Sequence, residues 1–217
     1  FHDIQSNHQL ESNEEKLKKK TGGRKVHTTL AFVHTYPDGD RDFSFYRNPG
    51  ADMMLRKEEV SLEKICASKI FHFGTLSFTH AGIRTASQYA IQCAKEAGAL
   101  ISFDPNLREP LWENLEDARK AIEYGMECCD ILKISDNELT FMTGEKDYDK
   151  GAVLLQQKYQ IPLVCVTLGK DGSRAYYKGL TIKAEPFLQK NTIETTGAGD
   201  TFTLSLIHIS EPTRQEA

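Results

Sequence analysis

The sequence predicts an α/β protein with a mostly parallel central sheet, and three observations support that fold class. Segments typical of strands alternate with segments typical of helices from residue 57 onward. Two strand segments, 100–103 and 163–166, are nearly continuous apolar runs, as in strands that are covered on both faces. Polar clusters follow several strands where each strand ends, which is where open α/β sheets bind ligands.

Composition excludes several classes of protein. Of the 217 residues, 27 are Lys or Arg and 31 are Asp or Glu, so the net charge of -4 offers no basic field to nucleic acid or an anionic membrane. No apolar run approaches the ~20 residues of a membrane span, and residues 1–20 lack the apolar core of a secretory signal. Five cysteines without a C-x-x-C pair are typical of free thiols. We therefore expect a cytoplasmic protein without a metal site built from side chains alone.

The amino-terminal part divides into a polar segment and a hairpin. Residues 1–25 are polar and aperiodic, and we assign them no function. Within 26–56, residues 26–34 favour a strand, 37–40 have turn chemistry, and 43–46 alternate in polarity as a second strand. The sequence therefore predicts an antiparallel hairpin before the α/β core.

Residues 57–203 are expected to form that core. Apolar residues recur every three to four positions between Leu115 and Cys129, as on one face of a helix. The expected elements are strand 69–73, helix 83–97, strand 100–103, helix 115–128, strand 131–134, helix 138–142, helix 152–159 and strand 163–168. Ligands are then expected at the carboxyl ends of the strands.

The cluster at residues 197–200 reads Gly-Ala-Gly-Asp. Small residues let the backbone approach a ligand, and consecutive N–H groups that open a helix bind phosphate or a developing anion. The carboxylate of Asp200 could accept a proton from an attacking hydroxyl while these amides stabilise a transferring phosphoryl group. A glycine-containing turn with Asp200 as a helix cap explains the same residues equally well.

The cluster after strand 100–103 contains Asp104, Asn106 and Arg108 at alternating positions. On an extended strand end the three side chains would point the same way. Arg108 could then hold a phosphate oxygen and Asn106 a sugar hydroxyl. A structural turn built on Asp104 and Pro105 is the alternative.

Two further clusters also leave two interpretations open. Ser135 and Glu138 have the spacing of a helix capping box, and Glu138 could instead face phosphates and hold magnesium through water. Thr167, Gly169 and Gly172 predict either a turn between two strands or a glycine-opened shelf for a nucleotide.

Together and in this order, the clusters resemble the ribokinase-like carbohydrate kinases of the PfkB family, and among them the bacterial fructokinases. The resemblance extends from about residue 28 to 203. Its segments are Thr28–Val33, Phe43–Arg47, Pro49–Asp52, Asp104–Arg108 and Thr195–Asp200. It implies a three-layer sandwich with a small β lid, and ATP-dependent transfer of a γ-phosphoryl group to a sugar hydroxyl with Mg²⁺.

The resemblance also implies roles for individual residues. Asp200 would be the catalytic base, Arg108 a phosphate or substrate contact, and Glu138 the organiser of Mg²⁺. The anion hole would consist of Gly197, Ala198 and Gly199. The implied nucleotide contacts are Ser135, Thr167, Gly169 and Gly172, and the implied sugar contacts are Arg47 and Asn106. The hairpin would be a lid that excludes water and could serve as the clasp of a homodimer.

The chain departs from the family pattern in four places. The usual upstream strand with its Gly-Gly motif is absent, so we expect a fold that is incomplete at both ends. Glu194 stands where Asp is frequent, which leaves K⁺ dependence open, and Ser135 stands where Asn is common. Residues 204–214 match the translation of a transposase sequencing adapter. We therefore expect residues 204–217 to be an artefactual tail, and the chain as it stands to bind ATP weakly.

Two other classes of protein compete with a sugar kinase. One is a catalytically inactive sugar- or nucleotide-binding module of the same fold, favoured by the absent Gly-Gly segment and disfavoured by the retained Asp200. The other is a dinucleotide-binding oxidoreductase domain, which would need a G-x-G-x-x-G after its first strand that the sequence lacks. Which sugar a kinase of this kind would accept is left open.

Overall fold

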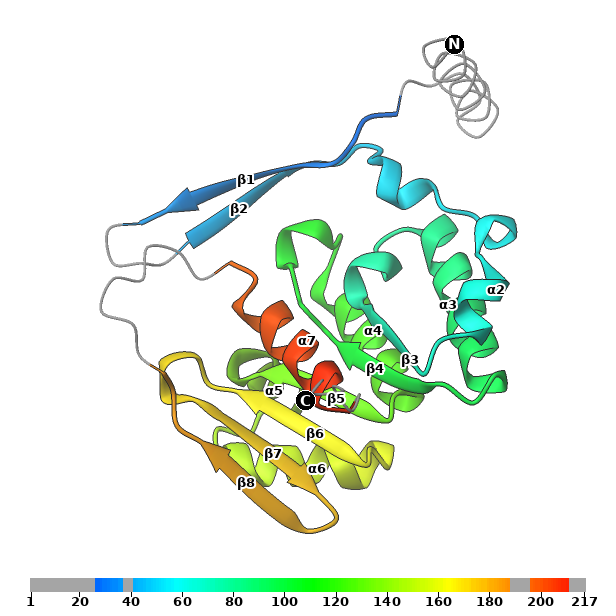
Figure 1. Ribbon diagram of the computed structural model, residues 1–217. Coiled ribbons are helices and arrows are strands. Elements are labelled where there is room, and N and C mark those ends of the chain that lie inside the picture. The colour runs from blue at the N-terminus through cyan, green and yellow to red at the C-terminus, as the bar shows by residue number, and fades with distance from the viewer. Residues whose placement is uncertain (1–25, 37–40, 188–195, 211–217) are drawn as a thin grey trace, which may run out of the picture.

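The computed structural model describes residues 26–36, 41–187 and 196–210 (Figure 1). The expectations for residues 1–25, for the turn at 37–40, for Glu194 and for the part of the tail at 211–217 lie outside the described residues. Within the described part of the chain, no helix combines the length and the apolar character that crossing a membrane requires.

An antiparallel two-stranded sheet forms the predicted hairpin. Strand β1 (Leu30–Thr35) pairs with β2 (Arg41–Tyr46) so that Leu30 lies opposite Tyr46. Phe43 and Phe45 share the other face, with ring centroids 6.1 Å apart in a stacked arrangement. Figure 1 shows the hairpin extending above the α/β core on the side where helix α7 (Ala198–Ser210) begins.

The core contains one mixed sheet of six strands in the order β3-β4-β5-β6-β7-β8. The parallel strands are β3 (Ile70–Gly74), β4 (Leu100–Asp104), β5 (Ile131–Ser135) and β6 (Leu163–Thr167). The antiparallel strands β7 (Ser173–Tyr177) and β8 (Leu180–Ala184) extend the sheet beyond β6. The predicted mostly parallel sheet is therefore confirmed.

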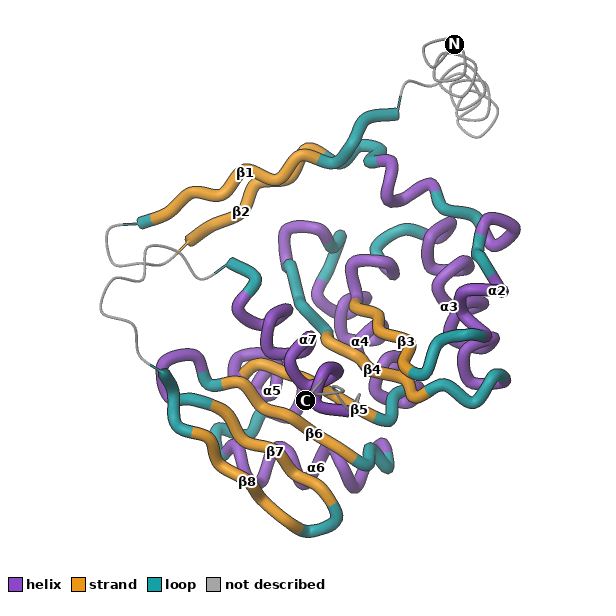
Figure 2. The backbone as a smooth tube through the Cα atoms, in the orientation of Figure 1, coloured by secondary structure: helices purple, strands orange, loops and turns teal. Residues whose placement is uncertain are grey.

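Helices lie on both faces of this sheet (Figure 2). The longer ones are α2 (Leu62–Cys66), α3 (Ala81–Glu96), α4 (Leu115–Cys128), α5 (Asp136–Thr143) and α6 (Tyr148–Tyr159). Short 3-10 helices occupy 51–54, 57–59, 75–78, 109–111 and 169–171. Helices α3 to α6 cover one face, because successive right-handed crossovers in the same direction place them together, and α7 lies on the other.

The two faces of the parallel strands differ in polarity. The face toward α3 to α6 is apolar and buried, and its central residues are Phe73, Phe103, Leu132, Ile134, Val164 and Val166. Helix α4 packs tightly here, since a Cβ atom on Gly125 would lie 2.2 Å from the ring of Phe103. The face toward α7 has His72, Ser102, Asp104 and Lys133 at alternate positions of the same strands. The apolar runs 100–103 and 163–166 are thus buried on both faces, as predicted, although Ser102 and Asp104 of β4 lie on the face toward α7.

Two helices begin earlier than the hydrophobic pattern predicts. Helix α5 begins at Asp136 rather than near 138, and α6 begins at Tyr148 rather than near 152. The first turn of α6 is polar and is stabilised by Asp147, whose side chain accepts hydrogen bonds from the N–H groups of Asp149 and Lys150. Hydrophobic periodicity does not detect such a turn, because Asp147 acts as a polar cap and Gly151, the buried residue of the turn, has no apolar side chain.

Candidate functional site

Helix α7 opens at the predicted glycines. Gly197 has a φ of 81°, a left-handed conformation that favours glycine, and its carbonyl accepts the N–H of Thr201 at 2.8 Å. Asp200 is the third residue of the helix and is exposed. It therefore does not occupy the cap position before the first helical residue, so the interpretation of Asp200 as a simple cap is wrong.

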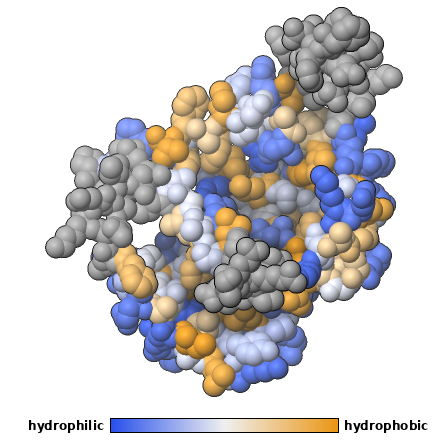
Figure 3. Space-filling model, viewed as in Figure 1, coloured by the Kyte–Doolittle hydropathy of each residue, from blue (hydrophilic) through white to orange (hydrophobic). Residues whose placement is uncertain are grey.

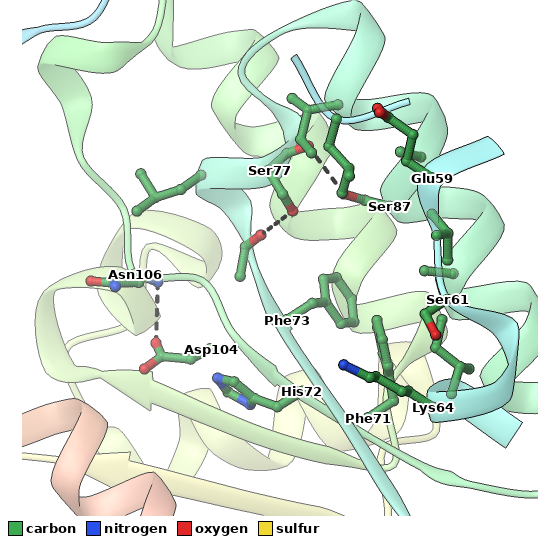
Figure 4. A pocket seen from close by; sticks show the side chains of 18 of the residues that line it. Glu59, Ser61, Lys64, Phe71, His72, Phe73, Ser77, Ser87, Asp104 and Asn106 are labelled. Atoms are coloured by element: carbon green, nitrogen blue, oxygen red, sulfur yellow. Dashed lines mark hydrogen bonds between the residues drawn. The ribbon is translucent and has the colours of Figure 1, made fainter. Parts of the chain in front are cut away.

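A pocket of about 570 Å³ lies beside Asp200 at the edge of β3. Asp104, Asn106 and His72 form its polar side, as Figure 4 shows. The opposite side has the apolar side chains of Phe71 and Phe73 together with polar side chains such as Lys64 and Ser87. The structure thus brings Asp200 and the cluster after β4 to one cavity at the carboxyl ends of parallel strands, where α/β sheets bind ligands.

The side chains of Asp104, Asn106 and Arg108 do not point the same way, so that prediction is wrong. Asn106 has a φ of 44°, which ends the extended conformation after β4. Asp104 accepts the N–H of Asn106 at 3.1 Å, as in the alternative interpretation of a structural turn. Arg108 turns toward the lid, with its guanidinium carbon 5.2 Å from the ring centroid of Phe43.

Glu138 forms the predicted capping box. Its Oε2 accepts the N–H and the hydroxyl of Ser135, both at 2.9 Å, and the Ser135 hydroxyl accepts the N–H of Glu138. Its Oε1 accepts the N–H of Leu107 at 2.7 Å. The buried carboxylate therefore joins the beginning of α5 to the loop that follows β4.

Thr167, Gly169 and Gly172 form a turn between two antiparallel strands, so the turn interpretation is confirmed. The N–H of Leu168 donates to the carbonyl of Gly172 at 2.9 Å across this turn. A Cβ atom on Gly172 would lie 2.1 Å from the carbonyl oxygen of Ala184, so only glycine fits beside the end of β8. Contact of these residues with a nucleotide stays a prediction.

Arg47 lies at the base of the lid, and its side chain is only 8% exposed. Its Nε donates to Asp52 at 2.8 Å, Nη1 to Thr79 at 2.7 Å, and Nη2 to the carbonyl of Leu76 at 3.1 Å. These bonds connect the hairpin to the core. Arg47 also borders a cavity between the lid and the loop containing Pro110, so it remains a predicted sugar contact.

Lys133 and His72 belong to the site although no role was predicted for them. Lys133 pairs with Asp104 at 2.9 Å, and both side chains are less than a tenth exposed. Burial raises the pKa of Asp104, and the Lys133 ammonium opposes that rise. Burial likewise lowers the pKa of His72, and its Nδ1 lies 3.0 Å from the Ser102 hydroxyl. A charged residue inside the apolar run 131–134 was the sequence signal for Lys133.

The donor set suits a metal that binds mainly through water and phosphate. Among the described residues no group of three or more His, Cys, Asp or Glu is placed to hold a metal ion. Mg²⁺ commonly binds one or two carboxylates together with water and substrate phosphates. Asp104 and Glu138 lie within electrostatic reach of each other at this edge of the sheet, and they are the carboxylates that would hold such an ion through water.

A cavity at the carboxyl ends of a mostly parallel sheet is the usual place for a ligand in an open α/β fold. The model of the pfkB family carbohydrate kinases matches residues 17–208. This chain therefore belongs to the PfkB family, as its sequence motifs indicated.

Curated relatives in plants are fructokinases. The chain is 46% identical over 181 residues to "Probable fructokinase-2" of Arabidopsis thaliana, a match that covers 83% of the chain and 55% of that relative. It is 43% identical over 180 residues to fructokinase-2 of Solanum lycopersicum, with the same two coverages of 83% and 55%. The chain thus spans about half the length of the curated relatives it matches.

Solved bacterial structures have the same fold. The fructokinase of Xylella fastidiosa with bound ATP matches with a TM-score of 0.73 and 31% identity, covering 84% of this chain and 56% of that one. The fructokinase of Vibrio cholerae with fructose, ADP and calcium ion matches with a TM-score of 0.74 and 30% identity, covering 85% and 59%. The predicted ribokinase-like fold is confirmed.

Proposed function

We propose that this chain is part of an ATP-dependent fructokinase in which Asp200 is the general base. The observation that carries the proposal is the position of Asp200 in the first turn of a glycine-opened helix, beside a pocket shared with Asp104 and Asn106. The relatives support it, since the plant proteins and the bacterial proteins of known structure described above are fructokinases.

In this proposal the first turn of α7 divides the chemistry between a carboxylate and backbone amides. Asp200 accepts the proton of the sugar hydroxyl whose oxygen attacks the γ-phosphorus of ATP. The N–H groups of residues 197–199 donate to the oxygens of the transferring phosphoryl group, and the positive end of the helix dipole adds to their effect. The bond from the γ-phosphorus to the bridging oxygen breaks, and ADP leaves.

The remaining residues bind and orient the reactants. The nucleotide contacts are Ser135, Thr167, Gly169 and Gly172, and the sugar contacts are Arg47 and Asn106. Arg108 contacts phosphate or sugar, and Glu138 orients a water ligand of Mg²⁺. When bound, Mg²⁺ would neutralise charge on the phosphates. The lid, residues 26–56, covers the sugar and keeps water from the phosphoryl group.

The test is a sugar-phosphorylation assay on the natural full-length protein that carries this chain. Fructose is assayed beside ribose, 2-keto-3-deoxygluconate and a nucleoside, with ADP formation as the readout. Asp200→Ala is expected to lower kcat by a factor of about 10² to 10⁴, the usual contribution of a general base. Glu127→Ala, which removes an exposed carboxylate of α4, is the matched control.

Two outcomes would contradict this proposal separately. If the wild type phosphorylates a sugar and Asp200→Ala does so at the same rate, the base assignment is wrong. If the wild type binds a sugar or ADP in calorimetry but phosphorylates nothing, the protein is the inactive binding module.

The lid also provides a dimer clasp in this proposal. Phe32 and Leu30 are 61% and 50% exposed on the face of the hairpin opposite Phe43, and apolar residues gather over the hairpin in Figure 3. Pairing two such faces would remove them from water. Light scattering is expected to give a dimer for the wild type and a monomer for Phe32→Ser; a monomeric wild type would rule out the clasp.

A further inference from the structure

Lys133 carries a buried charge in the centre of the sheet. It occupies the middle of β5 between β4 and β6, and its side chain is 9% exposed. Lysine is almost never fully buried without a partner, because removing an ammonium from water is costly. A lysine at this position therefore needs groups nearby that compensate its charge.

The ammonium of Lys133 holds the carboxylate that shapes the loop after β4. Nζ lies 2.9 Å from Oδ2 of Asp104, whose side chain is 4% exposed. The other oxygen, Oδ1, accepts the N–H of Asn106 at 3.1 Å. Asn106 has a left-handed φ of 44°, a conformation that needs support from its surroundings in a residue other than glycine. Lys133 thus supports the Asn106 turn through Asp104.

The same ammonium lies directly under the first turn of α7. A Cβ atom on Gly199 would lie 2.8 Å from Nζ of Lys133, so the backbone of the first turn of α7 lies next to the lysine. Gly199 is one of the residues whose amides form the proposed anion hole, and Asp200 follows it. One buried positive charge is therefore adjacent both to the anion hole and to the loop of Asn106.

His72 is a third titratable residue near this lysine. Burial is the main cause that lowers the pKa of His72; the charge of Asp200 raises that pKa and the charge of Lys133 lowers it. His72 therefore lies within electrostatic reach of both Lys133 and Asp200.

We propose that Lys133 is a positioning residue for phosphoryl transfer. Its ammonium adds positive charge beneath the amides of residues 197–199, and through Asp104 it holds Asn106 in place on the pocket that Asn106 shares with Asp200. The proposal rests on the proposed kinase function. A charge fixed in a dry site before the reaction needs no reorganisation when negative charge develops on the phosphoryl group, which favours the transition state over the ground state.

The test uses two variants of the full-length protein. Lys133→Met removes the charge at similar length but leaves Asp104 buried and unpaired, which destabilises the fold. The double variant Lys133→Met with Asp104→Asn removes both charges and keeps a neutral polar group that can accept the N–H of Asn106. Lys150→Met is the matched control, since its side chain on α6 is 71% exposed.

For the double variant we expect kcat to fall by about 100-fold, while KM for the sugar changes by less than about twofold. Calorimetry without turnover is expected to show weaker binding of ADP with aluminium fluoride, a planar mimic of the transferring phosphoryl group, while ADP alone binds as before. A purely structural role would lower the unfolding midpoint in urea and leave kcat of the folded protein unchanged.

The outcomes separate this proposal from the proposed function. A double variant that is folded and has the wild-type kcat and the wild-type affinity for the fluoride complex overturns the role of Lys133 and leaves the kinase intact. A wild type that phosphorylates no sugar refutes the proposed function. The role of Lys133 is then tested by whether the double variant binds ADP with aluminium fluoride more weakly than the wild type does. If the wild type does not bind that complex either, both proposals fail.

Discussion

The two faces of strands β3 to β6 consist of alternate residues of the same strands, and they have different tasks. Phe103 and Leu132 point to the face covered by α3 to α6 and are fully buried among apolar neighbours. Asp104 and Lys133, the next residue of each strand, point to the face under α7 and form a buried ion pair. One face stabilises the fold by excluding water, and the other keeps charges at fixed positions.

The two faces contribute differently to the free energy of unfolding. Burying apolar area is favourable at roughly 25 cal/mol per Å², whereas a buried ion pair contributes little or even costs free energy relative to apolar residues. A polar face under α7 therefore has no advantage for stability alone. Its presence at the carboxyl ends of the strands agrees with a site for chemistry.

The largest expected effect on stability comes from the apolar face. Phe103→Ala is expected to lower the free energy of unfolding by about 3–5 kcal/mol, because it leaves a cavity against Gly125 and Phe73. Urea denaturation followed by circular dichroism measures the change. Ser102→Ala, one residue earlier on the other face, is the control and should cost less than about 1.5 kcal/mol. Equal losses would mean that the two faces do not differ as described.

An intermediate effect is expected at the polar edge of the sheet. Glu138→Ala removes the acceptor of the N–H groups of Ser135 and Leu107, so the free energy of unfolding should fall by about 2 kcal/mol. Glu116→Ala, on an exposed ion pair of α4, is the control and should cost less than about 0.5 kcal/mol. A loss at Glu138 no larger than at Glu116 would show that the capping box is not structural.

The smallest effect concerns the pH dependence of stability. Burial holds the pKa of His72 below its usual 6.5, so the unfolded state binds the proton more readily than the folded state. The stability contribution of neutral His72 is therefore present above about pH 6.5 and is lost as the pH falls below that value. His72→Asn should make the free energy of unfolding fall less steeply between pH 7 and 5.

The control for His72 is the same substitution at the exposed His34. The informative quantity is the difference in slope between each variant and the wild type. Identical slopes for wild type and His72→Asn would mean that the polar face does not keep the imidazole neutral.

Local sequence patterns were sufficient for much of the fold. The apolar runs at 100–103 and 163–166 are strands, and the apolar period around Ile122 is the buried side of α4. The glycines at 197 and 199 open a helix as expected. Prediction succeeded at these positions because hydrophobic periodicity, secondary-structure propensity and the residues that end an element all depend on neighbours in the chain.

The error at residues 104–108 has a physical cause beyond the local sequence. The alternation of Asp104, Asn106 and Arg108 suggested one direction for three side chains, but Asn106 adopts a left-handed φ of 44°. In that conformation the N–H of Asn106 donates to Asp104, which pairs with Lys133 from the neighbouring strand. No local pattern contains a bond between residues that are far apart in the sequence.

By itself, the sequence determined the order of strands and helices between residues 69 and 168, the polar clusters at the strand ends and the membership of a kinase family, because each depends on residues close together in the chain. Only the tertiary structure decided that Lys133 pairs with Asp104 under Gly199 and that Asp200 shares a pocket with Asn106 and His72. The strand register and the packing of α7 onto the sheet bring these groups together, and both arise from contacts across the whole core.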